Sequence, residues 1–520
     1  MTRVRRNLWR IALLPLFFLL ARPASATIDY TVSVAHPERH IFDVTMQVPA
    51  VHDELTVQMP AWNTLYQIRD FASHMMRVQA LDEQNHELPL VKIDKQTWQI
   101  TGSGTITIKY PIYWDEPGPF SSQLNSDHAF LNLAMVLLYV PDRRAEDTRV
   151  EFVDVPVPWR IAVELDPAKT SAGASGTTFV ASSYDALVDA PVEISDFQEF
   201  RIEAGGRPIR IVVHGDAGDR NKLADEVKRI VNYQVSLMGG SPFREYMFLF
   251  HVGPDYGGGG MEHENSTAIA ADFPSQLPAY AAHEFFHTWN VKRIRPKSLV
   301  PVDYTKEMYT RALWFAEGVT NTYGAYTLER TKLWSPKQLY ANLADQISDL
   351  ESRPAHLWQS VEQSSLDAWL EKYSLYTSPQ ESISYYNKGE LIGVALDIVI
   401  RDRTDNRGSL DDVLRALNRE FAQRGRPYDE SKDLRAVAEQ VIRQKDPSAD
   451  ADLKDFFDRY VAGTVEIPFA DILGRAGLGL RETTQRGGDS DYQIYELKDP
   501  TEKQRRIRDG ILRGTTDAPR

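Results

Sequence analysis

The chain has 520 residues, no cysteine and a formal net charge of −14. A length of this kind normally divides into two or three domains. So acidic a chain is a poor candidate for binding nucleic acid, because that binding depends on lysine and arginine neutralising phosphates. The lack of cysteine excludes disulfides, a cysteine nucleophile and cysteine-ligated metals, and leaves histidine and carboxylates as metal ligands.

The first 26 residues are typical of a signal peptide. An apolar run, IALLPLFFLLA, is followed by the A-x-A cleavage site Ala24–Ala26 and preceded by four arginines, Arg3, Arg5, Arg6 and Arg10. The apolar run is too short to span a bilayer as a stable helix. We therefore expect cleavage, export to the periplasm or beyond, and a mature chain without a transmembrane segment; the alternative is an uncleaved membrane anchor.

Residues 27–205 contain short alternating runs, among them TIDYTVSV and RVEFVDVPV, punctuated by Pro, Gly, Asn and Asp. Alternation with period two predicts an all-β domain. The histidines of this region have no metal-ligand spacing, and we interpret them as structural or exposed: His36, His40, His52, His74, His86 and His128.

Helical patterns replace the strands beyond residue 205, first at LADEVKRIVNYQVSLMG (Leu223–Gly239), and continue to about residue 480. The fold class predicted is therefore α+β multidomain, with an N-terminal all-β domain (27–205) followed by a mainly helical domain (206–480). Residues 481–520 have few apolar anchors, which predicts a charged tail that is exposed or forms a short helix.

The pentapeptide HEFFH, residues 283–287, predicts a zinc site with its own general base. Residues four apart lie on one face of a helix, so His283 and His287 can bind one metal ion while Glu284 lies beside it. Pro278 suits the first turn of such a helix. Catalytic zinc usually takes three protein ligands and one water, and a neighbouring carboxylate can accept the proton of that water.

Glu317 is the candidate for the third ligand, because it is a lone carboxylate in the apolar helical segment LWFAEGVTNTYGAY. Burying such a carboxylate in an apolar core costs free energy unless the carboxylate is paired with a cation or bound to metal. The alternative for Glu317 is a salt bridge to Arg311. If Glu317 is not the ligand, His263 or Glu264 is the next candidate. A His2Glu site can also take cobalt or manganese.

Two further segments bear on the substrate. Four glycines, Gly257–Gly260, precede Met261, Glu262 and His263 after a strand-like run, and glycine allows close backbone approach to a ligand. The segment SISYYNKG places Tyr385 and Tyr386 at the start of a long apolar helix, where a phenol can donate a hydrogen bond to a developing oxyanion.

Together, HEFFHTWNVKRIRP, LWFAEGVTNTYG, GGGMEH and YYNKG resemble the glycyl aminopeptidase family, the sixty-first metallopeptidase family among the gluzincins. The resemblance spans most of residues 28–480 and implies a thermolysin-like zinc metallopeptidase domain. It implies that His283, His287 and Glu317 bind one zinc ion per chain and that Glu284 is the base.

The same resemblance assigns two substrate contacts. GGMEH is similar to the GxMEN exopeptidase motif, so Glu262 would bind the free amine, with Gly259 and Gly260 bringing backbone close to the substrate. YNKG is similar to YEKG, so Tyr386 would stabilise the oxyanion, with Tyr385 as its competitor. Members of this family often carry a PDZ-like domain after the catalytic domain, but the residues beyond AGLGLRE are too few for one.

We therefore expect a zinc-dependent aminopeptidase that hydrolyses N-terminal residues from peptides, with Gly and Ala preferred by resemblance. One alternative is a zinc endopeptidase with the same core, in which Glu262 is merely structural. The other is a non-enzymatic scaffold with a dead site.

Overall fold

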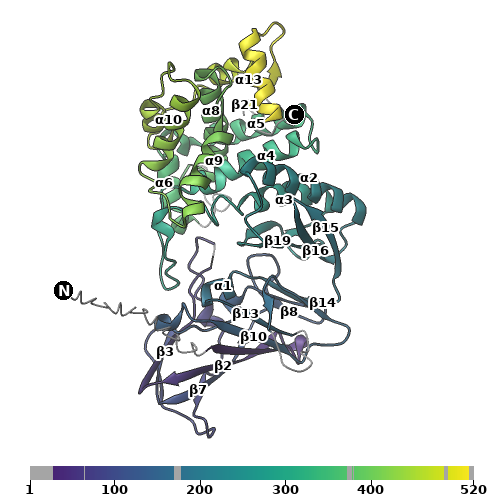
Figure 1. Ribbon diagram of the computed structural model, residues 1–520, viewed down its shortest axis with the longest axis vertical. Helices are drawn as coiled ribbons and strands as arrows, with labels where there is room; N and C mark the ends of the chain where they lie inside the picture. The colour runs from purple at the N-terminus through teal and green to yellow at the C-terminus, as the bar shows by residue number, and fades with distance from the viewer. Residues whose placement is uncertain are drawn as a thin grey trace, which may run out of the picture.

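The computed structural model describes residues 27–63, 65–168, 177–371, 378, 380–484 and 490–514. The predicted signal peptide lies outside these residues. Within them, an all-β part precedes a mainly helical part, which confirms the predicted fold class (Figure 1).

The N-terminal domain contains three sheets. A seven-stranded sheet has the order β12-β13-β10-β1-β2-β7-β4, a three-stranded sheet the order β3-β6-β5, and a four-stranded sheet the order β11-β14-β9-β8. The strands are β1 (Ile28–Ser33), β2 (Ile41–Val51), β3 (Glu54–Gln58), β4 (Gln79–Leu81), β5 (Leu90–Lys92), β6 (Thr97–Thr101), β7 (Gly104–Tyr113), β8 (Gln123–Leu124), β9 (His128–Leu131), β10 (Thr148–Val153), β11 (Arg160–Ala162), β12 (Asp166–Pro167), β13 (Thr178–Ala181) and β14 (Val192–Ser195), with one short helix, α1 (Tyr184–Val188).

Alternation along these strands builds the domain core. In β2 every second residue is buried, from Phe42 to Val48, and β2 pairs antiparallel with both β1 and β7. The buried face therefore follows directly from the period-two pattern in the sequence.

A five-stranded sheet opens the second domain, with the order β15-β16-β17-β19-β18. Its strands are β15 (Gln198–Ala204), β16 (Arg207–Gly215), β17 (Tyr246–Val252), β18 (Gly259–Glu262) and β19 (Ser266–Ala271). The predicted domain boundary, between residues 205 and 206, falls between the paired strands β15 and β16. The structure instead places the start of this sheet at Gln198, because β15 alternates as the earlier strands do and only its pairing reveals its sheet.

Helices form most of the rest of the second domain. They are α2 (Arg220–Met238), α3 (Leu277–Phe286), the π-helical turn η7 (Trp314–Gly318), α4 (Val319–Arg330), α5 (Pro336–Ser352), α6 (Val361–Leu366), α7 (Ala368–Glu371), α8 (Tyr385–Arg403), α9 (Leu410–Glu420), α10 (Asp433–Lys445), α11 (Lys454–Phe456), the π-helical turn η10 (Phe457–Val461) and α12 (Phe469–Arg475). Helix α3 packs between α2 and α4, and α8 packs on η7, α4 and α5. No helix among the described residues combines the length and the apolarity needed to cross a bilayer.

The C-terminal segment contains a helix, one of the two predicted alternatives, and a hairpin that the sequence did not predict. Strands β20 (Leu478–Thr484) and β21 (Ser490–Glu496) form a hairpin, and α13 (Glu502–Arg513) packs against α4 and α8. Ile507 and Ile511, one helical turn apart, are buried in the core of the helical domain. Two apolar residues with this spacing are enough to hold a helix whose other faces are charged.

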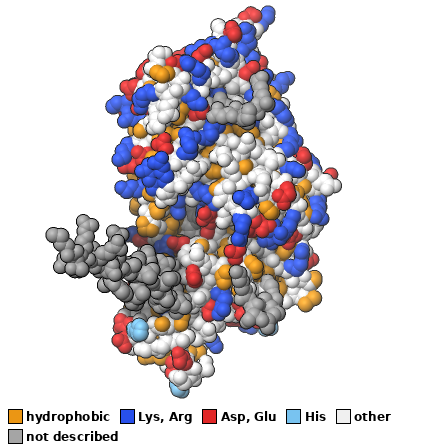
Figure 2. All heavy atoms as spheres, viewed as in Figure 1, with side chains coloured by type: hydrophobic (Ala, Val, Ile, Leu, Met, Phe, Trp, Pro, Cys, Tyr) orange, Lys and Arg blue, Asp and Glu red, His pale blue; other side chains and the backbone are white. Residues whose placement is uncertain are grey.

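The two domains interlock through a loop of the second domain. Tyr304 is buried in the core of the β domain, and Arg144 donates a hydrogen bond to the Val302 carbonyl. On the surface, acidic and basic side chains are interspersed over the helical part of the face shown in Figure 2.

Candidate active site

Helix α3 places the two histidines of HEFFH on one face. Pro278 lies in its first turn, and α3 is buried between α2, α4 and the sheet. The Nε2 atoms of His283 and His287 lie 3.0 Å apart. His287 Nδ1 lies 2.6 Å from the Asn290 carbonyl oxygen, to which it donates, so Nε2 keeps its lone pair for a ligand.

Glu317 reaches the same point from η7. Its Oε2 lies 3.2 Å from His287 Nε2 and 3.6 Å from His283 Nε2. The π-helical turn is a local widening of a helix that occurs often at functional sites. Arg311, the alternative partner, is exposed. The other candidates point elsewhere: His263 lies against Asp189 and Glu264 against Arg293.

The spacing of these donors fits a tetrahedral zinc ion. Bonds of about 2.0–2.1 Å at tetrahedral angles place neighbouring donor atoms about 3.3–3.4 Å apart. Two of the three observed separations, 3.0 and 3.2 Å, are slightly shorter than that value and the third, 3.6 Å, is slightly longer. Two imidazoles and one carboxylate are also a donor set suited to zinc.

The charge around the histidines favours a cation. Burial raises the pKa of the Glu284 carboxyl well above its ordinary value, and Glu262 and Glu317 add to this effect although His287 opposes it. Burial alone would lower the pKa of His287, but the three carboxylates raise it to about 10. Two buried carboxyl groups, Glu284 and Glu317, and the half-buried Glu262 therefore surround these two imidazoles, and a divalent ion bound there would favour the charged form of all three.

The glycines explain how Glu284 fits beneath strand β18. A Cβ atom on Gly260 would lie 2.4 Å from the Glu284 carboxyl group, and one on Gly259 would lie 3.0 Å from the Phe120 ring. Gly259 also has a φ of +111°, which only glycine adopts easily. The edge strand can approach helix α3 because Gly260 lacks a side chain, and it can approach Phe120 of the β domain because Gly259 does.

Glu262 lies at the end of β18, between two cavities. One contains the candidate metal ligands, and the other extends past Lys292 and Tyr304 toward the β domain. One carboxylate oxygen each of Glu262 and Glu284, and a ring nitrogen of His287, lie within 4.8 Å of one another. The carboxylate of Glu262 therefore lies close to the candidate base, Glu284, and to the candidate metal ligand His287.

The two tyrosines at the start of α8 have different surroundings. Tyr386 lines the cavity around His283, with the two ring centroids 6.3 Å apart. Tyr385 is buried behind it and stacks on it at 4.8 Å. Of the two, the structure brings Tyr386 to the metal ligands.

Six residues of this cavity of about 350 Å³ were not expected from the sequence: Leu65, Tyr66, Phe120, Ala279, Tyr280 and Asn321. The first three come from the β domain, which therefore forms part of the site. Ala279 and Tyr280 lie one turn before His283 on α3, and Asn321 lies one turn after Glu317, so helical spacing could have revealed these three. No local signal marks the other three.

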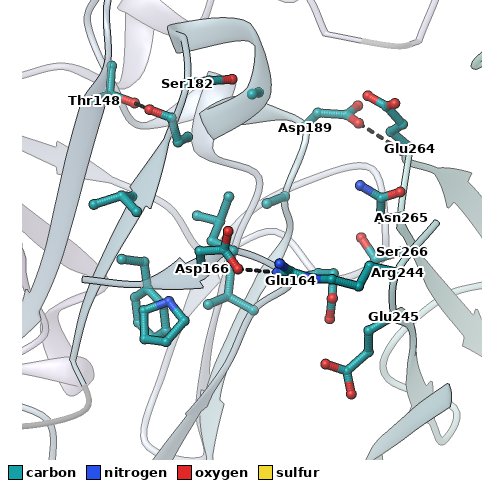
Figure 3. Close-up of a pocket in the computed structure, with 18 of the residues that line it drawn as sticks. Thr148, Glu164, Asp166, Ser182, Asp189, Arg244, Glu245, Glu264, Asn265 and Ser266 are labelled. Atoms are coloured by element: carbon teal, nitrogen blue, oxygen red, sulfur yellow. Dashed lines mark hydrogen bonds and ion pairs between the residues drawn. The ribbon is translucent and has the colours of Figure 1, made fainter. Parts of the chain in front are cut away.

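A larger cavity, about 1080 Å³, lies away from these residues, between the two domains. Its labelled walls in Figure 3 are mainly polar, and Arg244 pairs there with Asp166. It lacks the histidine and glutamate donors of the smaller cavity.

Comparison with known families follows this geometry. One family model, the M61 glycyl aminopeptidase, matches residues 277–392, and a second, the peptidase M61 N-terminal domain, matches residues 29–196. Together they cover more than half of the chain. The first match contains His283, His287, Glu317 and Tyr386, whereas Glu262 lies between the two matches. No curated protein matches the chain.

Solved structures are similar as well, among them the following two. An aminopeptidase N family protein from Idiomarina loihiensis superposes with a TM-score of 0.81 and 26% identity, covering 89% of this chain and 81% of that chain. An M1 zinc metallopeptidase from Deinococcus radiodurans superposes with a TM-score of 0.50 and 14% identity, covering 85% of this chain and 95% of that chain. At that identity the second likeness concerns the fold alone.

Proposed function

Because this chain belongs to the M61 glycyl aminopeptidase family and is a peptidase, we propose that it is a zinc-dependent aminopeptidase. His283, His287 and Glu317 would hold the zinc ion, as the donor set and its spacing support. When bound, zinc acts as a Lewis acid that polarises the scissile carbonyl and lowers the pKa of water. Cobalt or manganese could serve the same ligands.

Glu284 acts as the proton carrier in this proposal. One of its carboxylate oxygens, Oε2, is buried and has no hydrogen-bond partner among the described residues. A carboxylate in such a place takes a proton from the attacking water and returns it to the leaving amine.

Tyr386 and Glu262 complete the arrangement. The phenol of Tyr386 donates a hydrogen bond to the oxyanion as negative charge develops on the carbonyl oxygen. The Glu262 carboxylate binds the free ammonium group of the substrate by a charge-assisted hydrogen bond. One observation is the main support for an exopeptidase: a carboxylate oxygen of Glu262, one of Glu284 and a ring nitrogen of His287 lie within 4.8 Å of one another. An ammonium held there leaves room for only the first peptide bond at the reaction centre.

The test compares peptides with free and acetylated N-termini. Glu262→Ala should lower kcat/KM on free-amine peptides about 10- to 100-fold, because a hydrogen bond to a charged group contributes roughly 1.5–3 kcal/mol. Activity on acetylated peptides, low in the wild type, should change little. Glu264→Ala is the matched control, since this exposed neighbour pairs with Arg293.

One result would favour the endopeptidase alternative. If the wild type cleaves acetylated peptides internally as well as it cleaves free peptides, Glu262 is structural and the aminopeptidase proposal fails. A folded wild-type chain without hydrolysis of either set would instead favour the non-enzymatic scaffold.

We further propose that glycine and alanine are the preferred first residues, as the description of the family supports, and that the protein is exported, as its basic and apolar leader supports. Its substrates are then peptides outside the cytoplasm.

A further inference from the structure

A second group of metal-ligand side chains lies at the junction of the two domains. His128 on β9 and Glu193 on β14 belong to the β domain, and His251 on β17 belongs to the second domain. All three side chains are at most 2% exposed. In Figure 1 the strands β8 and β14 face the sheet that contains β16 and β19. His128 has no ligand spacing in the sequence and was expected to be structural or exposed, since Glu193 and His251 lie far along the chain.

The donor atoms of this group lie close together. Glu193 Oε2 lies 3.0 Å from His251 Nε2, and the other carboxylate oxygen, Oε1, lies 3.4 Å from His128 Nδ1. All three residues offer ligand atoms within 4.8 Å of one another. The carboxylate thus has one oxygen near each imidazole, and imidazole nitrogen and carboxylate oxygen are both zinc ligands.

The hydrogen bonds of this group leave one nitrogen of His128 and one oxygen of Glu193 free to bind a metal ion. His128 Nε2 lies 3.1 Å from the Gln123 side-chain oxygen, to which it donates, so His128 Nδ1 keeps its lone pair. That Nδ1 and Glu193 Oε1 are both buried without a hydrogen-bond partner among the described residues. Unsatisfied buried polar atoms are costly, and a metal ion would satisfy both.

Aromatic rings enclose the group. His214 stacks on His128 with ring centroids 4.4 Å apart and an interplanar angle of 7°. His214 Nδ1 lies 3.2 Å from Ser195 Oγ and 3.5 Å from Glu193 Oε1, so it borders the group. The Tyr256 ring contacts the rings of His128, His214 and His251.

We propose that His128, Glu193 and His251 bind a second zinc ion, distinct from the one proposed at HEFFH. Two ligands from one domain and one from the other make this ion a cross-link between the domains. Tyr256 belongs to the segment that leads from β17 to β18, the strand that ends at Glu262. The ion therefore stabilises the base of the substrate-binding strand without contacting the substrate.

Zinc content per chain tests the proposal. The full-length protein, purified with added zinc and dialysed, is analysed by elemental mass spectrometry. We expect two zinc ions in the wild type, one in Glu317→Ala, one in His251→Gln and none in the double variant. His128→Gln should repeat the result of His251→Gln, and His74→Gln, a histidine stacked on Trp114 outside the group, should retain both ions.

A stability measurement separates loss of metal from loss of folding. In the Glu317→Ala background, adding zinc ions should raise the melting temperature, and His251→Gln in that background should abolish the rise. One zinc ion in the wild type that is lost in Glu317→Ala and kept in His251→Gln would overturn the proposal. One ion that is lost only in His251→Gln would support it and refute the metal assignment at HEFFH.

Discussion

The imidazole of His287 donates to the Asn290 carbonyl, and the Asn290 side chain donates to the Phe315 carbonyl at 2.8 Å. This chain of hydrogen bonds runs from the HEFFH helix to η7, the turn that contains Glu317. The orientation of one candidate ligand is thus coupled to the position of another. Such outer contacts orient metal ligands and fix the ring nitrogen that binds.

Tyr386→Phe removes one hydroxyl and leaves the packing of α8 unchanged. Because loss of an oxyanion donor costs about 10²–10³ in kcat, kcat should fall by that factor with little change in KM or zinc content. Steady-state kinetics on free-amine peptides measures both constants. Tyr385→Phe is the matched control, since Tyr385 is buried behind Tyr386. Full activity in the first variant and loss in the second would reverse the assignment.

Gly260→Ala should inactivate the enzyme by displacing Glu284. The new Cβ atom would lie 2.4 Å from the Glu284 carboxyl group, so strand or side chain must move. A misplacement of about 1 Å can cost 10²-fold in rate, and we expect a loss of at least 10-fold in kcat. Gly258→Ala is the control, because its Cβ would be 3.5 Å from the nearest atom, the Tyr280 hydroxyl. Equal activity of the two variants would contradict this role of Gly260.

At the scale of elements, the site depends on one close helix contact. Gly318, which ends η7, packs directly on Gly389 of α8. This contact places Glu317 and Tyr386 on adjoining elements beside the same cavity. Backbone packing thus explains the glycines in AEGV and NKGE, Gly318 and Gly389.

Gly318→Ala should destabilise the protein, because a Cβ atom there would lie 2.4 Å from the Gly389 Cα. Overpacking of this kind typically costs about 1–3 kcal/mol, which chemical denaturation measures. Gly474→Ala in α12 is the control, since its Cβ would meet no atom within 4 Å. Alanine is the better helix former, so that control should be neutral or stabilising by up to about 1 kcal/mol. A stability of Gly318→Ala equal to wild type would show that α8 can shift freely.

For the whole molecule, the arrangement of the two domains completes the cavity. Leu65, Tyr66 and Phe120 of the β domain line it together with the motif residues of the second domain. Arg69 donates to the Phe120 carbonyl and pairs with Glu116, which supports the loop that presents Phe120. The C-terminal helix α13 closes the opposite end of the helical domain.

Ile507→Ala tests whether α13 is an integral part of the domain. Ile507 is fully buried against the helical core, and truncation of such a residue costs about 2–5 kcal/mol. The midpoint of chemical denaturation should fall accordingly. Arg513→Ala, at the exposed end of the same helix, should change stability by less than about 0.5 kcal/mol. If Ile507→Ala is also neutral, α13 docks without stabilising the domain.

The order of the domains and the motif residues followed from the sequence, because alternation and helical spacing are local properties. His283 and His287 are four residues apart, so one helix suffices to bring them together. The sequence left open whether the tail is exposed or forms a short helix, because two isoleucines, Ile507 and Ile511, gave too weak a local signal to decide; the structure has the helix. The start of the second sheet was missed for a similar reason, since β15 joins it only by pairing.

Tertiary structure alone decided which distant residues meet. Phe120 reaches the cavity from the other domain, and the contact of Gly260 with Glu284 depends on how an edge strand crosses a helix. The group of His128, Glu193 and His251 likewise forms only when two sheets face each other. Such contacts join residues that are not related by helical or strand periodicity. The sequence alone therefore predicts the helices, the strands and their reactive residues, whereas the packing of the domains determines which distant residues come into contact.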